Sequence, residues 1–324
     1  MCSLVTPCQP GAALRDMGNG PLTRNTSGVA NVPQRGAGGS FLRLVLKRAL
    51  RRLGLLDRAR WTRDRVNALA WLRHDRRFLR RGDGDGLPVP PARLRILTTA
   101  SPSVEWFIQS GRSGADSIRD LLARNGVPIA TIGSMLDFGC GCGRVLRHWA
   151  DSDLQVAGCD YNVDLVAWCR RKLPFARFET NTIEPPLPYP DASFDLVYAL
   201  SVFTHLPPAL QQRWIGEMAR ILRPTGYLIV STHGEGYLET LTTDEQDRIR
   251  GGQLVVHHDE EAGTNRCGVF FSEAYVRGDF APGFDVRDYA PRGARGNPPQ
   301  DLVLLQAQAT PRLGSTPTTT PPPP

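Results

Sequence analysis

A run of glycines between a predicted strand and a predicted helix constrains the fold of this chain most. The stretch is MLDFGCGCGRVLRHW, in which an apolar run leads into Asp137 and Gly139, Gly141 and Gly143 follow at every second position. Glycine tolerates positive φ and lets a ligand approach the backbone closely. Such a loop suits a nucleoside-like ligand at the carboxyl edge of a parallel sheet.

An acidic residue follows this loop at the end of the next apolar run. That run, LQVAGC, leads into Asp160, seventeen residues after Gly143. A carboxylate there can accept hydrogen bonds from both hydroxyls of a ribose. A tight structural turn would explain an isolated glycine pair, but here strand, glycines, helix, second strand and acid occur in order. A dinucleotide fingerprint would need glycine at position 144, which is Arg144, so we predict a different nucleoside cofactor.

Short apolar runs alternate with amphipathic stretches from about Ile96 onward, which predicts an α/β fold with a doubly wound, mostly parallel sheet. The two latest strands should form an antiparallel C-terminal hairpin at the sheet edge. Strands are predicted at 134–138, 154–159, 176–179, 194–199, 227–232, 284–289 and 301–306, and helices at 116–124, 144–150, 164–173 and 208–222. The predicted organisation is a disordered tail (1–40), a basic amphipathic helical extension with linker (41–95), the catalytic domain (96–309) and a disordered Pro/Thr-rich tail (310–324).

The run Asp-x-Gly-x-Gly-x-Gly, together with Asp160, resembles the S-adenosylmethionine (SAM) site of class I methyltransferases. FDLVYALSVFTHL (194–206) and ARILRPTGYLIVST (219–232) resemble that family's fourth strand and its helix-turn-fifth-strand segment, and the resemblance covers roughly residues 105 to 308. It implies a Rossmann-like fold and SAM as the methyl donor. The glycines would wrap the methionine part, Asp160 the ribose and Asn181 the adenine. The implied cofactor-binding residues are Asp137, Gly139, Cys140, Gly141, Gly143, Asp160, Tyr161, Asn181, Thr182, Leu200 and Ser201.

His205 in SVFTHL is the candidate catalytic residue. Methyl transfer from a sulfonium is a direct displacement, so the protein mainly aligns the acceptor, but a hydroxyl or ammonium acceptor must still lose a proton. An imidazole with a pKa of about 6.5 can take that proton near neutrality. Capping of the helix that begins at Pro207, or a hydrogen bond to a loop, is the alternative role. His233 is a weaker candidate on similar grounds.

The absence of certain motifs excludes several classes of methyl acceptor. The Pro-Pro-Tyr/Phe run of exocyclic-amine DNA methyltransferases and the Pro-Cys nucleophile of cytosine-C5 enzymes are absent after the fourth strand, which reads ALSVF. Ala199, Leu200 and Ser201 are neutral where metal-dependent catechol-type enzymes carry carboxylates, so we predict no essential metal. The expected acceptor is an oxygen or nitrogen of a small-molecule or glycan-type compound. A non-catalytic SAM-binding or scaffold module is the alternative.

Two further segments are candidates for walls of the site. The segment from Gly234 to Gly268 is longer than a simple connection and could form a lid or a substrate wall, although His257 and His258 lack the spacing of a zinc site. SVEWFIQSGR (103–112) stands where class I enzymes often place a segment over the cofactor. Trp106, Phe107 and Arg112 could stack on the cofactor or pair with its carboxylate, and packing in the core is the alternative for the two aromatic residues.

The formal net charge of +7 is local. Phe41 to Gly82 carries 14 Lys/Arg against three Asp, so the other 282 residues sum to −4. Arginines around an apolar stripe favour a solvated helix packed on the domain or an anionic membrane surface, contacted through Phe41 to Arg52, and disfavour nucleic acid. No signal peptide, no run of about 18 apolar residues and no disulfide pattern are evident, so we expect a cytoplasmic protein, peripheral to the membrane at most.

Overall fold

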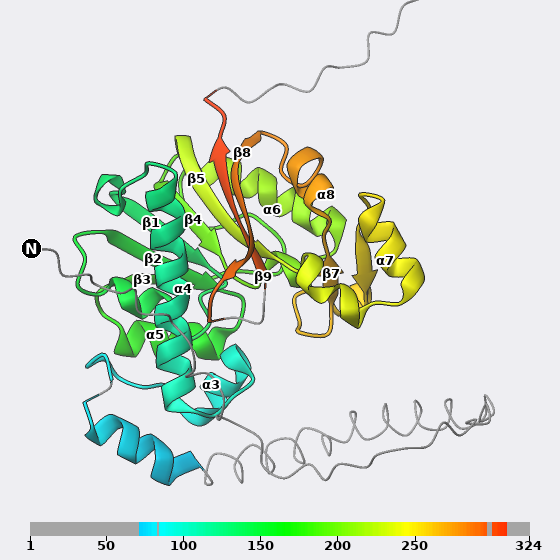
Figure 1. Ribbon diagram of the computed structural model, residues 1–324. Coiled ribbons are helices and arrows are strands. Elements are labelled where there is room, and N and C mark those ends of the chain that lie inside the picture. Colours follow the sequence, from blue (N-terminus) through cyan, green and yellow to red (C-terminus); the bar gives the residue numbers. More distant parts are fainter. Residues whose placement is uncertain (1–70, 83, 297–299, 310–324) are drawn as a thin grey trace, which may run out of the picture. The chain divides into compact units, whose positions relative to one another are not determined.

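Seven strands form one sheet in the order β3-β2-β1-β4-β5-β9-β8 (Figure 1). The structure is a computed structural model that describes residues 71–82, 84–296 and 300–309. Neighbouring strands from β3 to β5 pair in parallel, whereas β9 is antiparallel to both β5 and β8. The predicted fold class is therefore confirmed. The strands are β1 (Ser134–Phe138), β2 (Gln155–Asp160), β3 (Arg177–Thr180), β4 (Phe194–Ala199), β5 (Leu222–Thr232), β8 (Phe284–Ala294) and β9 (Gln300–Ala307).

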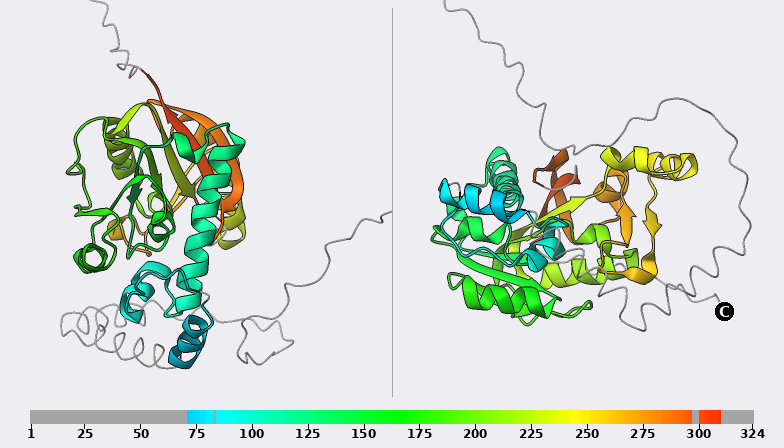
Figure 2. Two further views of the ribbon diagram at one scale, coloured as in Figure 1. Left: turned by 90° about the vertical axis from the view of Figure 1, so that its left-hand side faces the viewer. Right: turned by 90° about the horizontal axis from the view of Figure 1, so that it is seen from below.

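Both faces of the sheet are buried under helices. Successive residues of a strand point to opposite faces, and accordingly Met135 and Leu136 of β1 belong to different core clusters. Helices α4 (Val104–Arg124) and α5 (Val163–Lys172) supply the first cluster, and α6 (Pro208–Ile221) supplies the second. Figure 2 shows the long helix α4 lying against the strands. This two-sided cover is the doubly wound arrangement expected from the sequence.

Two predicted helices differ from the structure. The helix predicted at 116–124 begins twelve residues earlier, at Val104, where the Ser103 side chain accepts a hydrogen bond from the Trp106 amide. The helix predicted at 144–150 is wrong, because this stretch forms turns and the 3₁₀ helix η2 (Leu146–Trp149). Non-local partners hold this stretch, since the buried Arg147 guanidinium pairs with Asp85 and donates to the backbone carbonyls of residues 87 and 88.

A helical segment at residues 71–80 and helix α3 (Ala92–Thr99) precede α4. The buried Asp75 carboxylate joins all three, because it accepts hydrogen bonds from Arg95 Nη2 (3.0 Å) and from the Val104 amide (2.9 Å). The membrane-contact region predicted at Phe41 to Arg52 lies outside the described residues. Within the part of the chain that the structure describes, no helix is long and apolar enough to cross a bilayer.

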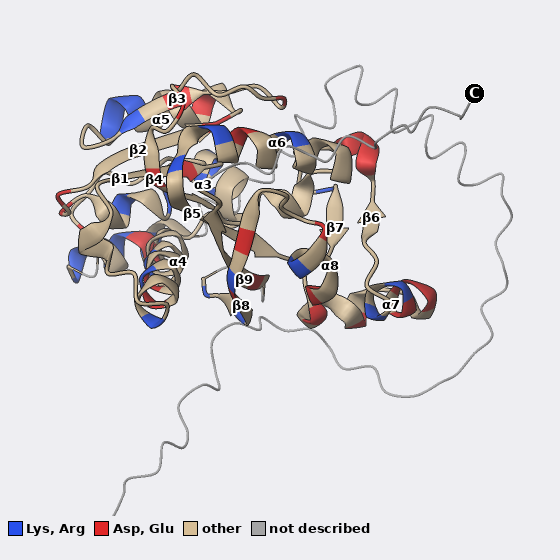
Figure 3. Ribbon diagram, turned by 90° about the horizontal axis from the view of Figure 1, so that it is seen from above, with Lys and Arg blue, Asp and Glu red and all other residues tan. Residues whose placement is uncertain are grey.

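After β5 the chain leaves the main sheet and returns at β8. This excursion lies beside the sheet in Figure 1 and includes a small two-stranded sheet, β6 paired with β7. Its helix α7 carries acidic residues in the first turn and basic residues in the last turn, which Figure 3 shows as red and blue ends. Its elements are η4 (Glu235–Thr240), α7 (Thr243–Arg250), β6 (Val255–His257), η5 (Asp259–Glu261), β7 (Gly268–Phe270) and α8 (Glu273–Gly278); η1 (Ile129–Thr131) and η3 (Phe203–His205) lie elsewhere in the chain.

Candidate functional site

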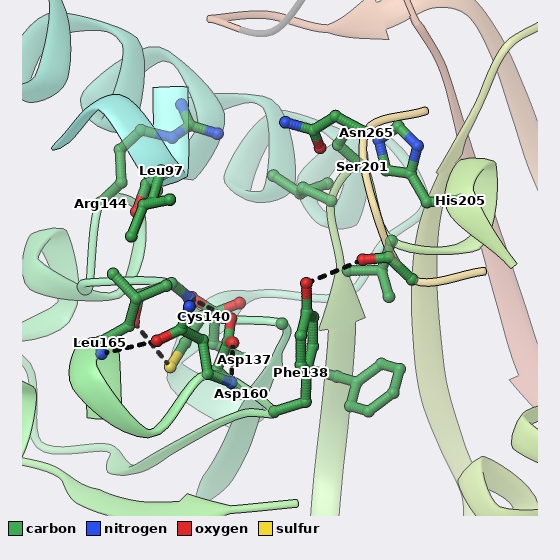
Figure 4. A pocket seen from close by; sticks show the side chains of 18 of the residues that line it. Leu97, Asp137, Phe138, Cys140, Arg144, Asp160, Leu165, Ser201, His205 and Asn265 are labelled. Atoms are coloured by element: carbon green, nitrogen blue, oxygen red, sulfur yellow. Dashed lines mark hydrogen bonds between the residues drawn. The ribbon is translucent and has the colours of Figure 1, made fainter. Parts of the chain in front are cut away.

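A cavity of about 680 Å³ opens at the carboxyl ends of the parallel strands. This volume is in the range of small-molecule pockets, about 300–1,000 Å³. Of the predicted site residues, all except Gly143 line it, namely Asp137, Gly139, Cys140, Gly141, Asp160, Tyr161, Asn181, Thr182, Leu200, Ser201 and His205. Figure 4 shows Asp137, Cys140 and Asp160 together on one side of the cavity and Ser201, His205 and Asn265 on another.

The loop after β1 requires glycine for two physical reasons. Gly139, Gly141 and Gly143 have φ of 78°, 57° and 75°, which side chains rarely adopt. A Cβ on Gly141 would also lie 2.7 Å from Thr98 Cγ2, and one on Gly143 would lie 2.6 Å from Leu173 Cδ1. Gly143 thus faces α5 rather than the cavity. Thr98 of α3 lies directly on the loop.

Asp160 is fixed by the backbone on both of its oxygens. Oδ2 accepts from the Gly141 amide (2.9 Å) and Oδ1 accepts from the Asn162 amide (2.8 Å). Burial raises the pKa of this carboxyl, and the two hydrogen bonds oppose the rise. A carboxylate oxygen has more than one acceptor position, so each oxygen can still accept from a ligand hydroxyl in the cavity.

Asp137 lies beneath the loop in a less polar setting. Burial raises its pKa to about 7, and the nearby Arg144 charge opposes the rise. The buried Arg144 guanidinium donates to the Gly296 carbonyl (3.2 Å) and lines the cavity. Asp137 therefore changes charge near neutral pH, with a cationic group close by.

The residues after β2 and β3 form another wall. The Tyr161 hydroxyl donates to the Gly263 carbonyl (3.0 Å), which ties this wall to the excursion after β5. Asn181 donates through Nδ2 to the Thr182 carbonyl (2.6 Å). Its Oδ1 is buried without a hydrogen-bond partner among the described residues. An unpaired buried acceptor is costly, so this oxygen suits a ligand donor such as the amino group of adenine.

Ser201 takes an unusual backbone conformation at the end of β4. Its φ is 60°, which is uncommon outside glycine and costs conformational energy. Three hydrogen bonds hold it: the Ser201 amide donates to Ser231 Oγ (2.7 Å), Ser231 donates to Gln300 Oε1 (2.7 Å), and Gln300 Nε2 donates to Ser201 Oγ (2.9 Å). Gln300 also lines the cavity, and no motif marked it in the sequence.

His205 is held by a loop rather than by the following helix. Helix α6 begins after Pro207 without a side-chain cap, so the capping alternative is wrong. Instead Nδ1 of His205 lies 2.7 Å from the Cys267 carbonyl, which can only accept. Nδ1 therefore carries the hydrogen and Nε2 carries the lone pair. Burial lowers the pKa of this imidazole, so it is neutral at neutral pH.

The side chains of segment 103–112 lie partly at the cavity and partly in the core. Trp106 lines the cavity, but Phe107 is fully buried in the core and Arg112 is not among the lining residues. Cover over the glycine loop comes instead from α3, whose Leu97 and Thr98 line the cavity.

The excursion after β5 contributes Tyr237, Thr264 and Asn265 to the lining of the cavity, so it forms part of the wall. His257 instead bonds Glu245 (2.7 Å), outside the cavity. Among the residues that the structure describes, no group of three or more His, Cys, Asp or Glu could hold a metal ion.

Comparison with known proteins gives the same assignment as the motif. A family model described as "Methyltransferase domain" matches residues 136–230. A malonyl-[acyl-carrier protein] O-methyltransferase of Enterobacter lignolyticus is 31% identical over 148 residues, 44% of this chain and 56% of that protein. A probable S-adenosylmethionine-dependent methyltransferase of Mycobacterium tuberculosis is 39% identical over 106 residues, 32% of this chain and 37% of that protein. A 27-O-demethylrifamycin SV methyltransferase of Amycolatopsis mediterranei is 34% identical over 110 residues, 32% of this chain and 39% of that protein. The chain thus spans little more than half, or less, of each of these curated relatives.

Proposed function

We propose that the whole protein is an enzyme that transfers a methyl group from SAM to an oxygen or nitrogen of a small-molecule or glycan-type acceptor. The reason is that residues 136–230 form a SAM-dependent methyltransferase domain of class I. One observation carries the cofactor part of this proposal. The Asp160 carboxylate accepts one hydrogen bond from the Gly141 amide of the glycine loop and one from the Asn162 amide after β2, and it borders a cavity of suitable size. The glycine loop and Asp160 are the two features that the sequence analysis singled out.

The residues of the cavity fit SAM. Asp160 would accept hydrogen bonds from the ribose hydroxyls, and the unpaired Oδ1 of Asn181 would accept from the adenine amino group. Gly139 and Gly141 line the cavity, so the methionine part would lie against their backbone. When bound, SAM supplies an electrophilic methyl group. The chain's own contribution is to orient the acceptor and to take its proton.

His205 is the proposed base. Its Nδ1–H is engaged by the Cys267 carbonyl, so Nε2 can accept a proton from an acceptor group in the cavity. A half-buried, neutral imidazole does not repel a bound sulfonium cation before the reaction, whereas an imidazolium would.

Calorimetry with S-adenosylhomocysteine tests the cofactor site. Asp160→Ala should abolish or strongly weaken binding, because both ribose contacts are lost. Asp153→Ala is the matched control, since Asp153 is exposed and precedes the same strand at its amino end. Equal affinity of wild type and Asp160→Ala would contradict the proposal. His205→Gln should keep the wild-type affinity for S-adenosylhomocysteine.

We also propose that the domain limits follow the sequence prediction, with a basic extension at 41–95 and the catalytic domain at 96–309, and that the protein is cytoplasmic with peripheral contact to an anionic membrane. The described part of the basic region supports such contact. Residues 71–81 expose five arginines, at positions 73, 76, 77, 80 and 81, that lie within one sector of the helix and line a common depression. Trp71, Leu72 and Leu79 are exposed on the same helix. Arginines beside exposed apolar side chains are typical of helices that bind the membrane interface.

A further inference from the structure

We infer that the acceptor is an uncharged, polyhydroxylated molecule such as a sugar, methylated on a hydroxyl oxygen, and that it binds at the end of the cavity formed by Ser201, His205, His233, Tyr237, Asn265 and Gln300. This set is called the acceptor end below. The inference rests on the proposed function, since it assumes that the cofactor lies along Asp137 and Asp160. Figure 4 shows that Ser201, His205 and Asn265 gather away from these two carboxylates.

The distribution of charge in the cavity is the first argument. Among the described lining residues, only Asp137, Asp160 and Arg144 carry a formal charge. The two aspartates are at the glycine loop, and the Arg144 charge acts on Asp137. The acceptor end contains only hydroxyl, amide, imidazole and phenol groups. Among the described lining residues of this end, an ammonium acceptor would meet no carboxylate, and a carboxylate or phosphate acceptor would meet no cation. The buried Asp301 carboxylate, which acts on Tyr237, is not part of the lining and accepts from the Tyr289 hydroxyl and the Arg292 amide. Burying an unpaired charge is costly, so this end disfavours all three.

Two imidazoles supply hydrogen-bonding capacity without charge. The rings of His205 and His233 lie 6.0 Å apart at an interplanar angle of 81°. His233 is nine-tenths buried, and its Nδ1 has no hydrogen-bond partner within the described parts of the chain. Burial, and to a smaller extent the neighbouring His205, lower the pKa of His233 to about 4. A hydroxyl-bearing ligand would satisfy such nitrogen atoms, which is the usual fate of buried polar groups.

The acceptor end also offers an aromatic surface. The His233 ring is 4.2 Å from that of Tyr237 and 5.3 Å from that of Phe270. Gln300 presents its amide beside them, fixed by Ser231 and Ser201. Flat rings next to fixed amides suit a molecule with an apolar C–H face and a rim of hydroxyls, which is the character of a sugar ring.

The proposed step balances with the groups present. The acceptor oxygen forms a bond to the methyl carbon while the carbon–sulfur bond breaks, and the electron pair of that bond remains on sulfur. The hydroxyl proton moves to Nε2 of His205. The products are a methyl ether, S-adenosylhomocysteine and an imidazolium that returns its proton to solvent. His233 touches the acceptor as a positioning residue.

Ligand-observed NMR on the full chain saturated with S-adenosylhomocysteine tests this inference. The probes are three sugars of one shape: methyl glucoside (neutral), glucosamine (cationic) and glucuronate (anionic). We expect the neutral probe to bind at least about tenfold more tightly than either charged probe. Equal or tighter binding of a charged probe, or no binding of methyl glucoside, would overturn the inference. So would transfer of labelled methyl to the glucosamine nitrogen faster than to the neutral glycoside.

A charge-introducing variant gives an independent readout. Asn265 is exposed and lines the acceptor end, so Asn265→Asp adds a carboxylate there without disturbing the core. It should raise the affinity for glucosamine and lower that for glucuronate. Gln253→Glu, which adds the same charge at an exposed position outside the cavity, should change neither. An unchanged preference in Asn265→Asp would contradict the placement of the acceptor. Calorimetry distinguishes failure of the acceptor inference from failure of the proposed function. If S-adenosylhomocysteine did not bind the wild type, the proposed function itself would be refuted.

Discussion

Gly111→Ala and Gly216→Ala make the same chemical change inside two α-helices. From the structure we expect the first to lower the stability of the protein and the second to raise it. A Cβ on Gly111 of α4 would lie 2.0 Å from the Arg144 carbonyl oxygen, 1.4 Å inside the 3.4 Å at which ordinary contact begins. The obstacle is backbone, which cannot swing aside as a side chain does. Gly216 in α6 is exposed, and a Cβ there meets nothing within 4 Å.

The expected magnitudes follow from this geometry. Alanine gains about 0.8–1.0 kcal/mol of helix propensity at either position. At Gly111 this gain is outweighed, because overpacking costs about 1–3 kcal/mol or more when a rigid neighbour must move. With about 2–4 °C of Tm per kcal/mol for a domain of this size, Gly216→Ala should raise Tm by a few degrees and Gly111→Ala should lower it.

Thermal unfolding followed by circular dichroism, with and without S-adenosylhomocysteine, measures both variants. Arg144 follows Gly143 directly, so Gly111→Ala should also weaken binding of S-adenosylhomocysteine. A Gly111→Ala protein with wild-type Tm and affinity would show that α4 does not press on the glycine loop as described.

Two further predictions concern charge. Burial raises the folded-state pKa of Asp137 to about 7 from its usual 3.8, so the contribution of this group to stability is fully present below pH 3.8 and is lost as the pH rises through 7. In urea unfolding between pH 5 and 8, the free energy of unfolding of the wild type should therefore fall relative to that of Asp137→Asn as the pH rises. Arg76→Glu/Arg80→Glu should reduce sedimentation with phosphatidylglycerol vesicles several-fold and leave the weak binding to phosphatidylcholine unchanged, whereas Arg171→Glu/Lys172→Glu on α5 should sediment like wild type. Loss of vesicle binding only in Arg51→Glu/Arg52→Glu would place the contact in the sequence-predicted region instead, and retention on RNA but not on vesicles would reject a membrane role.

Strands β1 and β4 were predictable to the residue. Both are central strands of a parallel sheet, buried on both faces, so their sequences are short apolar runs with sharp ends. The glycine loop and Asp160 were predictable for a related reason, since backbone conformation and sequence order alone mark them.

Other parts of the fold depend on partners far along the chain. The first half of α4 was not predicted from the sequence, because it contains Gly111 and Gly114 and glycine disfavours a helix. Close packing against neighbouring residues favours glycine at both positions. The stretch after Gly143 is amphipathic at helical spacing, yet the Arg147–Asp85 ion pair holds it in a tighter 3₁₀ turn. Likewise, Gln300 joins the site only because β9 lies beside β5, and no local pattern encodes that pairing.

The position of α3 bears on where this molecule can be shortened. Thr98 fills the space beside Gly141, and the Asp75 carboxylate connects Arg95 to the start of α4. The region of family similarity begins only at residue 136. A chain that begins at residue 136, or even at residue 96, would retain the glycine loop. It would lose all or part of α3, which packs beside that loop, and the Asp75 carboxylate, which holds α3. Residues of the proposed extension, Asp75 and Arg95, therefore support the domain proposed to begin at residue 96.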